Sequence, residues 1–218
     1  DKNALLKLTP KDKPPSPISV LPNGVDLDYF QPNSDIQRDE ETIVFSGKMS
    51  YHANISMVKY LVDEVMPRVW KVRPAARLII VGKDPTPDIK AFAENPLIAV
   101  TGTVADIRPF LWCATVSVVP LLYGAGIQNK ILEAMATGTP VVTTSRTLSA
   151  LEAQPGTEIL VADTADAFSA EVLRLLGNKT LVHEIGNAGL IYVQKNHSWK
   201  NITSRLIDVY RRVSQKNI

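Results

Sequence analysis

The sequence predicts an α/β fold built on a doubly wound parallel sheet of about six strands, with helices at its C-terminal end. Short apolar runs alternate with amphipathic helical segments along the chain. The runs are rich in β-branched residues and lack polar alternation, which is typical of parallel strands covered by helices on both faces. Gly47, Gly102 and the Gly124–Gly126 pair each follow a strand run, and ligands of such sheets bind beyond the carboxyl ends of the strands. A Rossmann-like domain with one nucleotide-sized crevice is therefore expected.

Apolar runs bounded by Gly, Pro and polar residues locate the strands, and 3.6-residue periodicity locates the helices. The expected strands are a short one at 18–21 and those of the sheet at 42–46, 77–81, 98–100, 115–120, 139–143 and 158–162. The expected helices lie at 54–72, 88–94, 106–111, from the glycine loop to Gly138, and at 164–176, 181–195 and 199–213.

Capping and breaking residues mark the ends of these helices. Asn54, Asp106 and Thr164 are expected as N-caps, because short polar side chains accept hydrogen bonds from the first free N–H groups of a helix. Pro67 falls inside the first helix and is expected to kink it or loosen its last turn, since proline has no N–H. Gly138 is expected to end the central helix.

The chain is organised around residues 120–142, PLLYGAGIQNKILEAMATGTPVV, which predict a strand, a glycine loop, a helix and a return strand. A helix that begins in a glycine loop directs free N–H groups and a positive dipole end at a ligand, and therefore suits phosphate. Lys130 adds a charge in the first turn. Glu133 lies roughly 7.5 Å along the axis from Gln128, where a carboxylate suits a hydroxyl pair. The alternative is a core helix on which Lys130 and Glu133 form a solvated i,i+3 pair.

The run GIQNKILEAMATGTPVV resembles the donor-binding motif of GT-B glycosyltransferases, specifically the retaining family 4 of nucleotide-sugar enzymes. The resemblance implies one half of a GT-B fold. It also implies that Glu133 holds the ribose hydroxyls and that the backbone amides of Gly126, Ile127 and Gln128 hold the diphosphate. Ala125 stands where the family commonly has a second glutamate.

Other segments carry the same resemblance. Gln128 and Lys130, together with YHAN at 51–54, resemble an exopolysaccharide-associated bacterial subgroup, and PNGVD at 22–26 resembles the family hinge. Lys48 lies beside Gly47 in the loop that borders the diphosphate in the family, and Asn54 stands near the place of a family lysine.

The resemblance extends to the nucleobase and to the leaving group. GTVAD at 102–106 matches the loop that borders the nucleobase, so Gly102, Thr103 and Val104 are candidate contacts, with Arg108 a weaker one. Lys130 and Lys48 are the expected stabilisers of the leaving diphosphate.

Three regions follow from this reading. Residues 1–35 are expected to be a linker, hinge and remnant of an N-terminal domain, and residues 36–196 the nucleotide-sugar donor-binding domain. Residues 197–218 match the family's final helix, which crosses back to the other domain. The chain begins at Asp1 without an initiating Met, and we expect it to be a piece of a longer protein whose N-terminal GT-B domain is its partner.

Composition excludes several classes. A net charge of +2 from 24 basic and 22 acidic residues gives no electrostatic basis for binding nucleic acid. The three histidines lie far apart, without ligands at metal-binding spacing, so no metal site is expected. The single Cys113 suits a reducing compartment, and no run is long enough to span a membrane. A cytoplasmic protein is expected, with peripheral membrane contact open for the full-length form.

The resemblance implies the donor-binding domain of a retaining glycosyltransferase, which moves a sugar from a UDP- or GDP-type donor to a saccharide or lipid-linked acceptor without a cofactor. Alone, this chain is expected to bind a nucleoside diphosphate without turnover. One alternative is an NAD-type oxidoreductase domain, but Gly124-x-Gly126-x-x-Asn129 lacks one glycine of that fingerprint and follows the wrong strand. A non-catalytic GT-B-like binding module is the other.

Overall fold

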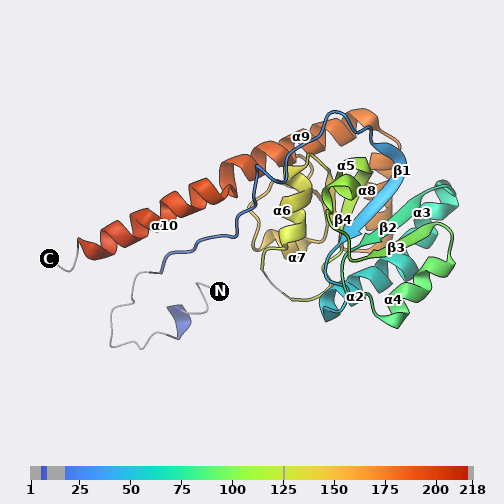
Figure 1. Cartoon of the computed structure of the whole chain (residues 1–218), viewed down its shortest axis with the longest axis horizontal. Coiled ribbons are helices and arrows are strands. Elements are labelled where there is room, and N and C mark those ends of the chain that lie inside the picture. Colours follow the sequence, from blue (N-terminus) through green and yellow to red (C-terminus); the bar gives the residue numbers. More distant parts are fainter. Residues whose placement is uncertain (1–5, 9–17, 125, 216–218) are drawn as a thin grey trace.

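A six-stranded parallel sheet forms the centre of the structure, a computed structural model that describes residues 6–8, 18–124 and 126–215 (Figure 1). The strand order is β3-β2-β1-β4-β5-β6, and every pairing is parallel. The strands are β1 Asp39–Ser46, β2 Arg77–Val81, β3 Ile98–Gly102, β4 Ala114–Val119, β5 Val141–Thr143 and β6 Leu160–Val161. The predicted Rossmann-like fold is confirmed.

Helices cover both faces of this sheet. They are α2 His52–Tyr60, α3 Met66–Val72, α4 Pro87–Ala91, α5 Arg108–Cys113, α6 Asn129–Ala136, α7 Ser145–Leu148, α8 Ala165–Leu176, α9 Lys179–Asn196 and α10 Trp199–Ser214, with a π turn η1 Leu61–Val65 and a 3₁₀ turn η2 Phe92–Glu94. The chain runs outward from β1 to β3 in one half of the sheet and from β4 to β6 in the other half. Because the crossovers are right-handed, the helices of the two halves lie on opposite faces of the sheet. Accordingly α3 contacts α8, and α6 contacts α9.

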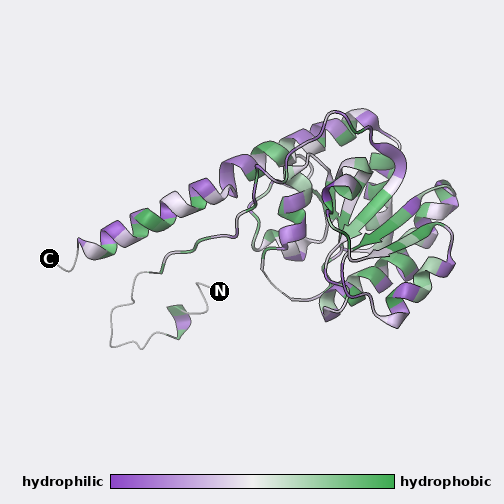
Figure 2. Cartoon of the chain, in the orientation of Figure 1, coloured by the Kyte–Doolittle hydropathy of each residue, from purple (hydrophilic) through white to green (hydrophobic). Residues whose placement is uncertain are grey.

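The core follows the apolar strand runs. All six residues of β4 are buried, as the absence of polar alternation predicts for a central strand. Hydropathic colouring shows apolar strands inside and polar residues on the outer helical surfaces (Figure 2).

Asn54 was predicted as the N-cap of the first helix, and this is wrong. The helix begins at His52 after the extended residue Tyr51, which places the Asn54 side chain within the first turn. The predicted effect of Pro67 is confirmed, because the π turn η1 separates α2 from α3 just before it. There the Met66 N–H donates to Leu61 O, a five-residue step. Pro67 itself occupies the first turn of α3, where a missing N–H costs least.

The predicted strand at 18–21 is also wrong. These residues are not in the sheet, and the first pairing of this segment is an isolated bridge between Val25 and Ser198. The Val25 N–H donates to His197 O at 2.8 Å, and His197 Nδ1 is hydrogen-bonded to Asn23 O at 2.9 Å. The buried His197 also contacts the Tyr192 hydroxyl through Nε2 at 3.0 Å. The junction between α9 and α10 at residues 197–198 therefore fixes residues 23–25.

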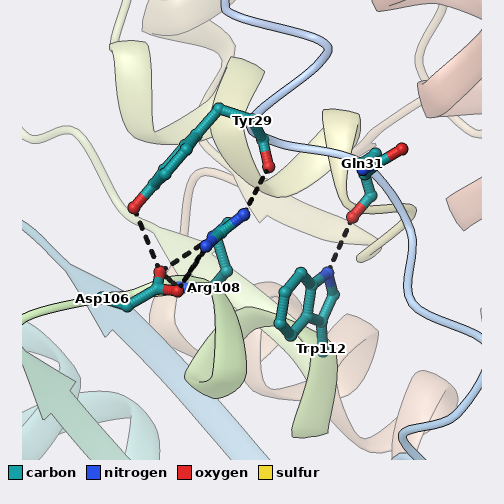
Figure 3. A network of polar contacts seen from close by, with 5 residues as sticks. All are labelled: Tyr29, Gln31, Asp106, Arg108 and Trp112. Carbon is teal, nitrogen blue, oxygen red and sulfur yellow. Dashed lines mark hydrogen bonds and ion pairs between the residues drawn. The ribbon is translucent and has the colours of Figure 1, made fainter.

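Residues 29–31 are fixed by α5 (Figure 3). The Arg108 guanidinium lies 3.9 Å from the centre of the Tyr29 ring and donates to Tyr29 O at 3.1 Å. Its second partner is Asp106, at 2.7 Å, and that ion pair holds the pKa of the Asp106 carboxyl below its ordinary value. Trp112 Nε1 donates to Gln31 O at 2.8 Å. Residues 23–31 are thus attached to the rest of the chain at two separate places.

Helix α10 extends away from the sheet, beside the N-terminal segment (Figure 1). Ile202 is its buried residue, and Arg205 contacts Val20 O at 3.5 Å. Trp199 lies against Gly24, where an added Cβ would come within 2.6 Å of the indole ring. None of the described helices is both long and apolar enough to cross a bilayer.

Candidate functional site

A cleft of about 470 Å³ opens where the strand order reverses, beyond the carboxyl ends of β1 and β4. This is the position at which doubly wound sheets bind their ligands. Most of the predicted site residues line it, namely Gly47, Lys48, Asn54, Thr103, Val104, Ile127, Gln128, Lys130 and Glu133.

Three predicted contacts, Gly102, Gly126 and Arg108, do not line the cleft. Gly102 and Gly126 have positive φ angles of 69° and 99°, and no heavy atom lies within 4 Å of a Cβ built on either. Their backbones turn the loops that carry Val104 and Ile127, since glycine adopts this conformation without steric cost. Ala125 lies outside the described residues.

Asn54 joins the two loops that meet at the cleft. Its Nδ2 donates to Lys48 O at 2.8 Å, and its Oδ1 accepts from the Lys130 ammonium at 2.6 Å. A Cβ at Gly47 would stand 2.8 Å from Asn54 Nδ2 and 3.0 Å from Lys130 Nζ. Glycine at position 47 therefore allows this amide and this ammonium to meet at the end of β1.

Lys130 is unusually buried for a lysine, with 8% of the residue exposed. Its ammonium lies 4.2 Å from the centre of the Phe45 ring, a favourable cation–π distance. Burial lowers the pKa of Lys130 to about 7. The alternative of a solvated Lys130–Glu133 pair is wrong, because the ammonium is held inside the protein by Asn54 and Phe45.

Glu133 follows Lys130 by three residues on α6 and lines the same cleft. Burial raises the pKa of the Glu133 carboxyl, and the nearby Lys130 opposes that rise. Half-buried carboxylate oxygens that face a cleft favour a ligand with hydroxyl donors, since such donors replace lost water.

The second predicted cation, Lys48, is half-exposed and forms an ion pair with Asp84 at 3.6 Å. Asp84 lies in the loop after β2, which reaches the cleft because Gly82 allows close contact with β1. A Cβ at Gly82 would lie 1.7 Å from Gly47 O. The Gly47 N–H donates to Val81 O at 3.0 Å and extends the pairing of the two strands by one residue.

The structure adds cleft residues that the sequence analysis did not select, including Lys83, Asn23, Tyr51 and Ser46. Lys83 follows β2, and its position after the strand-ending Gly82 was a usable signal. Asn23 precedes the first strand of the sheet, and its Nδ2 donates to Asn129 Oδ1 at 2.9 Å. Among the described cleft residues, Ser46 is the one with a buried side-chain oxygen that has no hydrogen-bond partner. Arg108 is engaged by Asp106 and Tyr29.

The chain matches the family model "Glycosyl transferases group 1" over residues 40–178. This chain belongs to the group 1 glycosyltransferases. The matched region contains all six strands of the sheet except the first residue of β1, and all the residues that line the cleft except Asn23.

Individual relatives agree with the family. The chain is 23% identical to a D-inositol 3-phosphate glycosyltransferase of Nocardioides over 92% of its own length and 50% of the relative. Sucrose-phosphate synthase from Thermosynechococcus elongatus superposes with a TM-score of 0.73 at 21% identity, covering 90% of this chain and 52% of that one. Anabaena HepE, solved with UDP-glucose, superposes with a TM-score of 0.70 at 12% identity over 89% and 57% of the two chains. The chain spans about half the length of the curated relatives it matches.

Group 1 membership favours the glycosyltransferase interpretation over an oxidoreductase one, and the position of the glycine loop after β4 agrees. Among the described residues, no group of three or more His, Cys, Asp or Glu side chains is arranged to hold a metal ion.

Proposed function

We propose that this group 1 domain is the donor-binding part of a retaining, family 4 type glycosyltransferase and that its cleft binds a nucleoside diphosphate sugar of the UDP or GDP type. One observation carries the proposal: a buried ammonium and a half-buried carboxylate, Lys130 and Glu133, face one cleft from a single helix beyond the switch point. Anabaena HepE, which shares the fold, was solved with UDP-glucose.

The roles follow from chemistry. The amides of Ile127 and Gln128 at the start of α6 suit the diphosphate, with Gly126 shaping their loop. Lys130 and Lys48 would offset the charge that develops on the leaving diphosphate, which is how a protein assists this step without a metal or a cofactor. Glu133 would accept hydrogen bonds from the ribose hydroxyls.

The remaining components are proposals for the whole protein. An N-terminal GT-B domain would supply the acceptor-side groups, and the acceptor would be a saccharide or lipid-linked saccharide of exopolysaccharide type. A cytoplasmic location, with peripheral contact to a membrane that holds such an acceptor, fits this assignment.

Calorimetry with UDP tests the ribose assignment. We expect Glu133→Gln to weaken UDP by about tenfold, because a charged hydrogen-bond acceptor is lost. The matched ligand control is 2′-deoxy-UDP. The wild type should bind it more weakly than UDP, whereas Glu133→Gln should bind 2′-deoxy-UDP and UDP with similar affinity. Equal UDP affinity for both proteins would show that Glu133 does not hold the ribose. GDP and ADP in parallel identify the base.

A non-catalytic module is the second candidate, and Ala125 in place of the usual glutamate favours it. An assay of nucleotide-sugar hydrolysis and transfer by the full-length protein separates the two, since a binding module would retain affinity without turnover.

A further inference from the structure

Three aromatic rings form a row at the rim of the cleft. The Tyr51 and His52 rings have centroids 4.7 Å apart and are tilted by 46°, and the His52 and Tyr123 rings are stacked at 5.5 Å with an interplanar angle of 1°. Tyr51 directly precedes helix α2 and His52 begins it, whereas Tyr123 lies in the loop after β4. Two elements separated in sequence therefore contribute to one aromatic surface.

This row is exposed although its rings are aromatic. Tyr51 is 53% exposed and Tyr123 is 40% exposed. Exposed aromatic groups next to a cleft commonly mark a ligand-binding surface. Tyr51 itself lines the cleft, and Tyr123 directly precedes the glycine loop that begins at Gly124. The row thus extends from the cleft to the loop that opens α6.

Hydrogen bonds hold the rings in place. The Tyr123 hydroxyl is bonded to His52 Nδ1 at 2.8 Å and to Ser56 Oγ at 2.9 Å, and Ser56 Oγ donates to His52 O at 3.1 Å. A surface fixed before binding loses little conformational freedom when a ligand arrives. Rings held this way with exposed edges and faces are organised for contact with a ligand rather than for the core.

We propose that Tyr51, His52 and Tyr123 form a platform that binds a pyranose ring. This inference rests on the proposed function and adds a sugar subsite to it. The apolar C–H face of a pyranose packs against aromatic rings, while its hydroxyl groups reach polar ring edges and the Ser56 hydroxyl. The pyranose comes from the donor if the nucleotide places it there, or from a saccharide acceptor.

Calorimetry with UDP-glucose, UDP-galactose and UDP tests the platform. We expect Tyr51→Ala to weaken the two nucleotide sugars by about 3- to 10-fold, as loss of an aromatic contact implies, and UDP by less than about twofold. Tyr51→Phe keeps the ring and should bind both sugars like the wild type. Tyr123→Phe keeps the ring but loses the bonds to His52 and Ser56, so an intermediate loss is expected.

Methyl glucoside, followed by NMR of the tyrosine rings, distinguishes the two sources of the pyranose. Shifts of the Tyr51 and Tyr123 signals with UDP-glucose and not with the glycoside assign the platform to the donor, and shifts with the free glycoside assign it to a saccharide acceptor. Tyr210→Ala on α10, a more exposed tyrosine outside the cleft, is the matched control and should change nothing.

Three results would overturn the proposal, and the last is distinguishable from the other two because it also contradicts the proposed function. If Tyr51→Ala weakens UDP as much as UDP-glucose, the ring stacks on the nucleobase and the platform is wrong while the nucleotide site stands. The platform is also wrong, and the nucleotide site stands, if no variant changes the affinity for UDP or its sugars and no tyrosine signal shifts with the glycoside. A wild-type chain that binds neither UDP nor its sugars would contradict the proposed function, and the platform with it.

Discussion

The centre of the site depends on three residues from different elements, Gly47, Asn54 and Lys130, each of which the other two require. Gly47 leaves the space in which the Asn54 amide and the Lys130 ammonium meet. The same Asn54 amide also donates a hydrogen bond to the backbone carbonyl of Lys48. A lysine with a lowered pKa in a cleft is a marker of function, because burial of an unpaired ammonium destabilises the fold. The burial of Lys130 is therefore better explained by a ligand anion than by stability.

The first prediction concerns pH and ligand affinity. Lys130 has a pKa of about 7 without ligand, and a bound diphosphate should raise it, so binding takes up a proton at higher pH. Affinity for UDP-glucose, whose phosphates keep a constant charge, should be level below pH 7 and fall by up to about tenfold per pH unit above it. Titrations at pH 6 to 9 measure this, and Lys130→Met should give a weaker but flat profile. A wild-type profile as flat as that of the variant would contradict the assignment.

The second prediction concerns stability without ligand. The folded-state pKa of Lys130 is lowered from 10.5 to about 7, so the folded protein holds this proton less tightly than the unfolded chain does. The free-energy cost of burying the charged ammonium is therefore present in full below pH 7. It decreases as the pH rises from 7 to 10.5 and is absent above pH 10.5. Lys130→Met should therefore raise the free energy of unfolding by roughly 2 kcal/mol at pH 6.5 and by little near pH 10. Urea denaturation at both pH values checks this, and an equal effect at both would disprove the cause.

At the scale of elements, the loops after β1 and β2 are in contact through their backbones. Gly82 and Gly47 adopt φ angles of 146° and 155°, which L side chains rarely adopt, and Gly47 O occupies the place where a Gly82 Cβ would stand. This contact brings Lys83 to the cleft and Asp84 into an ion pair with Lys48.

Substitution of glycines tests this contact. Gly82→Ala combines backbone strain with a clash against Gly47 O and should cost roughly 3 kcal/mol or more of stability. Gly102→Ala is the matched control at another strand end, where open space leaves only the strain of a φ of 69°, about 1 kcal/mol. Thermal unfolding compares the two variants. Equal losses of stability would mean that the clash with Gly47 O does not contribute to the effect of Gly82→Ala.

The sequence predicted elements best where local pattern and tertiary position agree. The apolar run 77–81 is the strand β2 at the same bounds, and Thr164 caps α8 by accepting from the Ala167 N–H. The prediction for Asn54 failed because the long-range contact with Lys130 outweighs a local capping preference. Residues 18–21 have strand-like composition but no strand beside them, and composition alone does not reveal a missing neighbour.

The candidate site was predictable where it follows from motif and topology. Glu133 and Lys130 were located by their spacing on one helix, and their cleft is where the switch point places it. The burial of Lys130 and the part played by Asn23 were not predictable, because they depend on packing between residues 76 and 106 positions apart in the chain. The site assignments themselves stay predictions until a ligand is measured.

At the scale of the whole molecule, α10 differs from the rest of the chain. Its apolar residues recur at helical spacing on one face, at Ile202, Leu206, Val209 and Val213. Within α10, however, Ile202 is the one residue that is buried. The helix leaves the domain after the contacts of Trp199 and Ile202 (Figure 1). An apolar face of this kind without a cover promotes association.

A chain that ends at residue 204 tests how far the domain depends on α10. It keeps Trp199 and Ile202, so we expect the melting temperature to change by no more than about 2 °C, because little buried apolar area is removed. Self-association at high concentration, measured by analytical ultracentrifugation, should be weaker than in the full chain. Val209→Lys with Val213→Lys in the full chain is the control, and it should lower association without shortening the helix. A large loss of stability on truncation would mean that the outer half of α10 belongs to the folding unit, and unchanged association would mean that its apolar face is not the surface through which copies meet.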